Sequence, residues 1–168
     1  MSNTCGPAGI LTSSSGHPSA ITFSSIPTRT THATDRAWPT HERRRFLAKD
    51  EVHNAFILFA MGAECNFNVA VGRYVIMPDH VHLFVRGDYN FRLGPWIGTL
   101  KQALAKAAKL SRAKAQIWEE GFFDHILRSN ESYSEKWNYV RENPVRAGLV
   151  KSVAEWPYQG EIVYIDLA

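Results

Sequence analysis

The chain has 168 residues, of which 45% are hydrophobic and 21% charged, and this balance excludes a wholly disordered protein. Lys and Arg number 19 against 16 Asp and Glu, so the formal net charge of +3 permits an anionic partner without identifying one. No apolar run approaches the ~20 residues of a membrane-spanning helix, and 2 cysteines are too few for a disulfide framework or a cysteine-based zinc site. We therefore expect a cytoplasmic protein with no membrane partner.

The first 40 residues are rich in Ser, Thr and Pro, a composition typical of turns and open chain. We expect 1–19 to be a disordered leader without the pattern of a secretory signal, and 20–168 to form a single domain. Within the first 40 residues, Ala20–Ile26 is the segment that favours a strand, and the first strand of the domain is expected within 20–40. Pro27 interrupts this region, which predicts a poor strand.

A helix and a hairpin are expected next. The helix should run from Asp50, which can cap it, to Gly62, which can end it. Phe67–Met77 is rich in β-branched and aromatic residues and ends at a Pro-Asp turn, whereas His80–Arg86 alternates in character from its first residue. These two runs predict a β-hairpin with a very short connection.

The rest of the domain should add two helices and a strand. Apolar residues recur at helical spacing over 93–107, and a strand is centred on 122–127. A last helix is expected to begin near Ser132, where Ser-x-x-Glu has capping-box spacing, and to end near Asn143 because Pro144 follows. This order predicts an α+β, ferredoxin-like antiparallel sheet with helices packed on it, plus one extra C-terminal helix.

His80 and His82 are the first candidates for chemistry. Alternate residues of a strand share a face, so both imidazoles project together while Val81 and Leu83 take the opposite face. Two rings about 7 Å apart along a strand can converge on one metal ion, and this pair directly follows a turn, where a site can be open. The alternative is a pair that is present through packing or by chance.

Tyr139 and Asn143 are the second candidate pair. Tyr133, Trp137 and Val140 form the apolar stripe of the last helix, and at 100° per residue Tyr139 lies about 120° from the centre of that stripe. Asn143 is expected on the same face as Tyr139, one turn along. A phenol and an amide oxygen are then presented together. The alternative is an ordinary boundary tyrosine with an asparagine at the end of the helix.

Four separated motifs occur in a fixed order along the chain. They are YVIMPDHVHLFV at 74–85, IWEEGFFDHILR at 117–128, YVRENPVRAGLV at 139–150 and WPY at 156–158. Together they resemble the motifs of REP-associated tyrosine transposases, which belong to the HUH single-tyrosine, IS200-like transposases. The resemblance extends over about 48–158.

The resemblance implies a transposase and endonuclease that nicks and rejoins single-stranded DNA bearing hairpins, through a 5′-phosphotyrosine intermediate. By position, it implies that Tyr139 is the nucleophile. It also implies that His80, His82 and Asn143 bind a divalent metal ion, and Mg²⁺ or Mn²⁺ suits an oxygen-rich phosphate site. Two alternatives stay open: a catalytically inactive relative that binds DNA hairpins, and an unrelated metal-dependent hydrolase.

DNA contacts are expected from cations that flank the proposed site, because neutralising phosphates gives a salt-dependent affinity. These cations are Arg43, Arg44, Arg45, Lys101, Lys106, Lys109, Arg112, Arg141 and Arg146. The alternative for each is an ordinary solvated helix face. Supporting roles at the site are open for Glu119, Glu120, Asp124 and His125. The sequence also leaves open whether the protein acts as a monomer or a homodimer, and on which hairpins (REP-like or insertion-sequence ends).

Overall fold

The computed structural model describes residues 33–88, 90–110, 116–119, 123–127 and 130–166. These residues form one five-stranded antiparallel sheet with the strand order β4-β1-β3-β2-β5. The strands are β1 (Ala33–Pro39), β2 (Val69–Ile76), β3 (His80–Gly87), β4 (Phe123–Leu127) and β5 (Gln159–Glu161). The helices are α1 (Asp50–Met61), α2 (Ala63–Phe67), α3 (Leu93–Ala107), α4 (Asn130–Arg141) and α5 (Asn143–Arg146).

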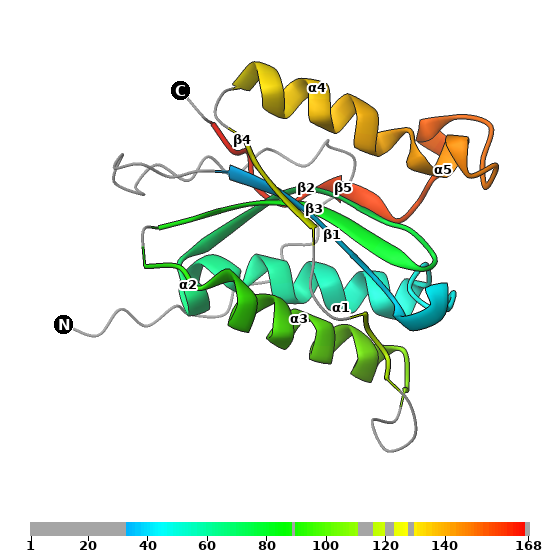
Figure 1. Ribbon diagram of the computed structural model, residues 1–168, viewed down its shortest axis with the longest axis horizontal. Coiled ribbons are helices and arrows are strands. Elements are labelled where there is room, and N and C mark those ends of the chain that lie inside the picture. The colour runs from blue at the N-terminus through cyan, green and yellow to red at the C-terminus, as the bar shows by residue number, and fades with distance from the viewer. Residues whose placement is uncertain (1–32, 89, 111–115, 120–122, 128–129, 167–168) are drawn as a thin grey trace, which may run out of the picture.

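The helices cover both faces of the sheet, with α1 and α3 on one face and α4 on the other (Figure 1). The order of the first four strands, with α1 leading from β1 to β2 and α3 leading from β3 to β4, is the ferredoxin-like split βαβ arrangement. The sequence-based prediction of an α+β, ferredoxin-like sheet is confirmed. Among the described helices, none is long and apolar enough to cross a bilayer.

Strand β3 contributes to both layers of the core because its side chains alternate. Val81, Leu83 and Val85 are buried against the α1 and α3 layer. Phe84 is buried on the other face, in a second cluster with Tyr133 of α4. The predicted alternation of this strand is therefore confirmed, and residues 80, 82 and 84 share the face that α4 covers.

The N-terminal strand lies further along the chain than its strongest local pattern suggests. Ala20–Ile26 falls outside the described residues, whereas β1 lies within the expected 20–40 interval and pairs with both β3 and β4. The composition of this region, which favours open chain, therefore does not prevent Ala33–Pro39 from forming a strand. Its local composition is weak for a strand, but pairing on both sides and the fully buried Trp38 stabilise it, so tertiary context overrides propensity.

Both expected helix starts lie within two residues of the observed ones, although the expected N-cap of α1 is wrong. Asp50 is the first residue of α1 and Lys49 is its N-cap, although the helix does end at Gly62. Helix α4 begins at Asn130, two residues before the capping-box serine. After Gly62 the short helix α2 follows, so β2 begins at Val69 rather than at residue 67.

Pro144 separates two helices instead of only ending one. Helix α4 ends at Arg141, and Asn143 is the first residue of α5. A proline is tolerated in the first turn of a helix, where its missing N–H has no partner to lose. The expectation that Asn143 lies on the same helix as Tyr139 is therefore wrong.

Candidate active site

The structure brings His80 and His82 together at the start of β3. Their ring centroids are 5.0 Å apart, with 78° between the ring planes. Both rings are partly buried, and they lie on the face of the sheet that α4 covers, next to Pro39 and Ala37 of β1. The pair therefore lies at one end of the sheet, where the β2–β3 turn brings β3 back alongside β2.

Asp79, in that turn, holds the first of the two histidines. His80 Nδ1 lies 2.8 Å from Asp79 Oδ1. Because a carboxylate only accepts hydrogen bonds, His80 donates from Nδ1 and turns the lone pair of Nε2 outward. Burial lowers the pKa of His80, although the hydrogen bond to Asp79 opposes this shift. A neutral imidazole, the form that binds metal ions, is thus favoured at neutral pH.

Sequence reasoning missed Asp79, although it is adjacent to the histidine motif. A carboxylate directly before a candidate metal-binding histidine is the available signal. The side chain direction at a turn cannot be read from strand alternation, so only the structure shows the contact.

Tyr139 lies on the outer side of α4 with 61% of its surface exposed, as the helical angle predicted. Its ring contacts two cations: the Arg146 guanidinium carbon is 4.2 Å from the ring centroid, and Lys136 Nζ is 5.7 Å away. Arg146 also donates to Asn143 Oδ1 at 2.7 Å. Arg146 therefore connects the candidate nucleophile to the candidate ligand.

The tyrosine end of α4 and the histidine pair lie at the same end of the sheet. Val140 shares a buried cluster with Met77, whose N–H donates to the carbonyl of His80 at 2.8 Å. Trp156 strengthens this junction, since its indole N–H donates to Ile76 O at 3.1 Å. In Figure 1, α5 and the end of α4 lie at the same end of the molecule as the β2–β3 turn.

The donors at this end of the sheet fit a divalent metal ion. In the part of the chain that the structure describes, no group of three or more His, Cys, Asp and Glu residues is arranged to hold one. The amide oxygen of Asn143, at the start of α5, is the third donor that the sequence singled out. Asn143 Nδ2 is buried without a hydrogen-bond partner, an unsatisfied polar atom of the kind that functional sites retain.

The proposed DNA-binding cations fall into three groups. Arg43, Arg44 and Arg45 follow β1 in the turn that leads to α1, and Arg141 and Arg146 lie at the junction of α4 and α5. Lys101, Lys106 and Lys109 belong to α3 or directly follow it, and Arg112 lies outside the described residues. Helix α3 packs on the sheet face opposite α4, so its lysines belong to a different layer from Arg141 and Arg146.

Lys101 is partly shielded from solvent. Its side chain is half-buried, its Nζ lies 3.4 Å from Glu119 O, and it lies over the Trp118 ring. Burial lowers its pKa.

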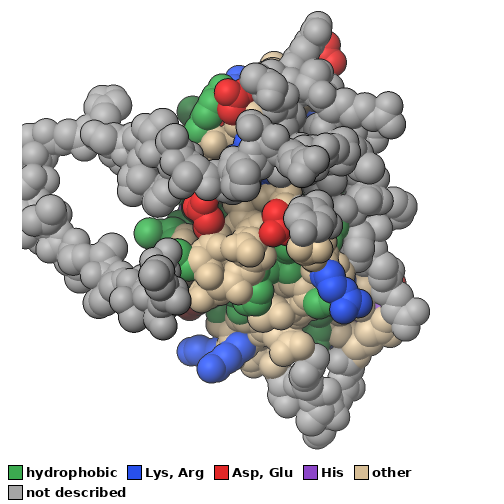
Figure 2. All heavy atoms as spheres, turned by 90° about the vertical axis from the view of Figure 1, so that its left-hand side faces the viewer, with side chains coloured by type: hydrophobic (Ala, Val, Ile, Leu, Met, Phe, Trp, Pro, Cys, Tyr) green, Lys and Arg blue, Asp and Glu red, His purple; other side chains and the backbone are tan. Residues whose placement is uncertain are grey.

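At the end of the molecule opposite the histidine pair, seen in Figure 2, basic and acidic side chains of the described residues form small separate groups rather than a continuous basic surface.

The sequence left the roles of Glu119, Glu120, Asp124 and His125 open. Glu119 Oε1 accepts the backbone N–H of Glu42 at 3.0 Å and lies 3.2 Å from His41 Nδ1, so Glu119 stabilises the turn after β1. Asp124 and His125 pair in register with Arg36 and Asp35 of β1. Glu120 is outside the described residues.

Comparisons with known proteins define the class. Residues 29–143 match the family model described as "Transposase IS200 like". The chain belongs to this family of transposases. Within it, the resemblance to REP-associated tyrosine transposases is confirmed by the relatives that the chain matches.

The chain is 30% identical over 91 residues to a REP-associated tyrosine transposase of Escherichia coli K12, covering 52% of each chain. A Haemophilus influenzae protein named provisionally as another such transposase is 28% identical over 94 residues, covering 49% of this chain and 53% of that one. The chain thus spans about half the length of the curated relatives it matches.

A solved structure, that of a REP-associated tyrosine transposase bound to a REP hairpin, has the same fold. The TM-score is 0.63 at 21% identity, and the match covers 80% of this chain and 81% of that one.

Proposed function

We propose that this protein is a DNA transposase and endonuclease that nicks and rejoins single-stranded DNA bearing hairpins, with Tyr139 as nucleophile. The main support is that the exposed Tyr139, which has cations against its ring, lies at the same end of the sheet as the histidine pair. One histidine of that pair is oriented by a carboxylate. Membership of the transposase family supports the reaction class. The relative whose solved structure contains a REP hairpin supports a hairpin as the DNA partner.

The proposed reaction exchanges one phosphodiester for another. Tyr139 Oη attacks the scissile phosphorus, the new bond joins Oη to the 5′-phosphate, and the bond from phosphorus to the 3′-oxygen breaks. The tyrosine loses its proton and the departing 3′-oxygen gains one. Attack by a 3′-hydroxyl reverses these steps and rejoins the strand, so no nucleotide cofactor is required.

Arg146 is well placed to assist this step. A phenol ionises only near pH ~10, so it needs help to become a nucleophile at neutral pH. The Arg146 guanidinium lies over the Tyr139 ring, so it would put positive charge beside a phenolate that forms there. Preorganised charge of this kind stabilises a transition state more than it stabilises the ground state.

His80, His82 and Asn143 would hold the divalent ion, for which Mg²⁺ or Mn²⁺ is the expected identity. When bound, the ion supplies Lewis-acid polarisation of the scissile phosphate. The Asn143 oxygen already accepts a hydrogen bond from Arg146. A carbonyl oxygen has two lone pairs, so it can serve the arginine and a metal ion together.

Phosphate contacts should come first from the cations on the site's own side, the turn after β1 and the junction of α4 with α5. Arg43, Arg45, Arg141 and Arg146 are all exposed there. We retain Arg44, Lys101, Lys106, Lys109 and Arg112 as further candidates for a longer DNA path.

The test is covalent capture of labelled DNA. Wild-type protein, Tyr139→Phe and His82→Ala are incubated with Mn²⁺ and a single strand that carries a hairpin and a label at its 3′ end, on the fragment that keeps the 5′-phosphate. A denaturing gel should show a protein–DNA adduct for wild type and none for Tyr139→Phe. His82→Ala should bind the DNA but form the adduct far more slowly. Tyr164→Phe is the matched control, because Tyr164 is 66% exposed but lies outside the site.

The other results identify the alternatives. Binding of the hairpin by wild type without an adduct indicates a catalytically inactive relative. Strand cleavage that survives Tyr139→Phe but is lost in His82→Ala indicates a hydrolase that activates water at the histidine pair.

A further inference from the structure

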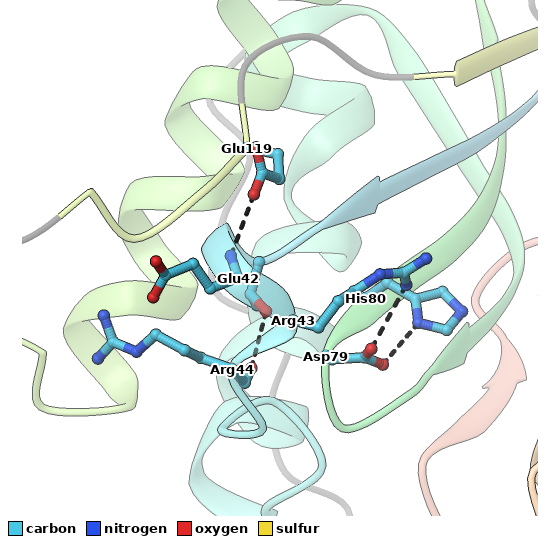
Figure 3. Close-up of polar contacts among 7 residues, drawn as sticks. Glu42, Arg43, Arg44, Asp79, His80 and Glu119 are labelled. Carbon is cyan, nitrogen blue, oxygen red and sulfur yellow. Dashed lines mark hydrogen bonds and ion pairs between the residues drawn. The ribbon is translucent and has the colours of Figure 1, made fainter.

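A continuous set of polar contacts joins the histidine pair to the basic turn after β1, and it centres on Asp79. One carboxylate oxygen accepts from His80 Nδ1 at 2.8 Å, and the other accepts from Arg43 Nη1 at 3.4 Å. Figure 3 shows the guanidinium and the imidazole meeting at this carboxylate. Asp79 and His80 are mostly shielded from solvent, with 23% and 18% of their side chains exposed, whereas Arg43 is 66% exposed.

The backbone around Arg43 is held in an unusual conformation. Glu42 and Arg43 both have φ of 53°, in the left-handed region that is costly for residues other than glycine. Such a conformation persists only where the surrounding structure fixes it. The turn has no glycine, so other contacts must supply the compensation.

Three contacts fix the turn, two of them with residues outside it. The Glu42 N–H donates to Glu119 Oε1 at 3.0 Å, and the hydroxyl of the fully buried Thr40 donates to Arg44 O at 2.7 Å. The Thr40 N–H donates to Asp79 O at 2.8 Å, which attaches the turn directly to the residue before His80. The turn and the β2–β3 connection therefore form one braced unit, from which Arg43 reaches the Asp79 side chain (Figure 3).

We propose that Asp79 is a positioning residue that orients His80 and Arg43 together. It fixes the Nδ1–H tautomer of His80, so that Nε2 faces the metal site, and it holds the base of an arginine whose outer face is open to a DNA phosphate. The phosphate contact and the metal ligand are thereby set at a fixed separation. This inference rests on the proposed function for the metal and DNA, whereas the orientation of His80 is a property of the protein alone.

The first measurement uses metal-free protein. Nitrogen-15 NMR of labelled histidines at slightly alkaline pH should show His80 as the Nδ1–H tautomer in wild type, with the His80→Ala spectrum assigning its signals. Asp79→Ala should shift His80 toward Nε2–H, the tautomer that imidazole prefers in water. Asp79→Asn keeps an oxygen that accepts from Nδ1, so it should retain the wild-type tautomer and serves as the variant of choice where Asp79→Ala folds poorly.

The second measurement is Mn²⁺ binding, followed by electron paramagnetic resonance without DNA. Loss of a carboxylate that orients a ligating histidine weakens metal binding about 10- to 100-fold, so Asp79→Ala should fall in that range and Asp79→Asn between it and wild type. Asp88→Ala is the matched control, since Asp88 follows the other end of β3. Arg43→Gln should leave the Mn²⁺ affinity within about twofold of wild type. It should also weaken the salt dependence of hairpin-DNA binding by one phosphate contact, which is a change of ~0.7–0.9 in the slope of log K against log salt concentration.

The outcomes separate the two proposals. An unchanged His80 tautomer together with unchanged Mn²⁺ affinity in Asp79→Ala overturns the positioning role. A changed tautomer in a protein whose wild type binds no Mn²⁺ supports the positioning role and removes the metal from the proposed function.

Discussion

Arg146 is the residue whose contacts bear most directly on the proposed chemistry. It lies on the Tyr139 ring and donates to Asn143, so one side chain touches both the candidate nucleophile and a candidate ligand. Removing its charge should slow attack on the phosphate even where DNA is fully bound. We expect Arg146→Gln to reduce the single-turnover rate of adduct formation at saturating DNA by at least about tenfold.

Two variants test that expectation. Arg146→Lys keeps the charge but loses the planar fork that stacks on the ring and reaches the amide, so it should fall between wild type and Arg146→Gln. Lys136→Gln removes the more distant cation on the same ring and should have the smaller effect. An Arg146→Gln rate equal to wild type at saturating DNA would show that Arg146 only binds DNA.

At the scale of residues, the sequence predicted on which face a side chain lies better than it predicted which residues that side chain contacts. The shared face of His80 and His82 and the exposed face of Tyr139 follow from strand and helix periodicity, and the structure has both. The contacts of Asp79 and Arg146 do not follow from periodicity, because a turn and the break before α5 set the directions of these side chains.

At the scale of the elements, the junction between β2 and α4 depends on a glycine. The pairing of β2 with β3 shifts register between Val71 and Tyr74, and a Cβ on Gly72 would lie 2.7 Å from Ile165 Cδ1 and 2.9 Å from Tyr133 Oη. Gly72→Ala therefore pushes on the layer that carries α4. We expect it to lower the free energy of unfolding by about 1–3 kcal/mol, measured by urea denaturation.

The matched control is Gly98→Ala in α3. A Cβ there meets nothing within 4 Å, and alanine favours a helix more than glycine does. This substitution should therefore stabilise the protein by up to about 1 kcal/mol. Equal effects of the two substitutions would contradict the packing explanation for Gly72.

Elements with strong local patterns were predicted well, and those defined by their neighbours were not. The β2–β3 hairpin and α3 have clear periodicity, and the structure has them within a few residues of the expected bounds. Strand β1 is recognisable only from its two partners, and the break between α4 and α5 depends on how Pro144 is accommodated. The strand depends on contacts between segments that are distant in the chain. The break depends on whether the helix ends at Pro144 or restarts there.

At the scale of the whole molecule, stability should depend on pH through a histidine outside the site. His53 of α1 lies 2.8 Å from the Tyr74 hydroxyl of β2, across the core layer that joins helix to sheet. Burial lowers the pKa of His53, an effect that Asp50 partly opposes, and burial raises the pKa of Tyr74 to about 12. The tyrosine thus stays protonated and can donate to a neutral His53.

The sign of the pH dependence follows from linkage. Because His53 has a lower pKa in the folded state, the unfolded chain binds more protons once the pH falls below about 6.5. The free energy of unfolding should therefore be fully present above that pH and decrease below it. Urea denaturation from about pH 8 to about pH 5 should show a steeper loss for wild type than for His53→Gln. Parallel curves for the two proteins would contradict this assignment; His80, whose pKa is also lowered, contributes equally to both.

The central place of β1 has a consequence for how the molecule forms. Residues 33–37 pair with β4, so Ala33 lies opposite Leu127, while the same strand pairs with β3 on its other side. The β2–β3 hairpin and α1 can assemble as soon as they are synthesised, but β1 keeps an unpaired edge until β4 emerges. Contacts between such distant segments slow folding and prolong the exposure of that edge. The growing chain is therefore most prone to aggregation in the interval between completion of the hairpin and arrival of β4.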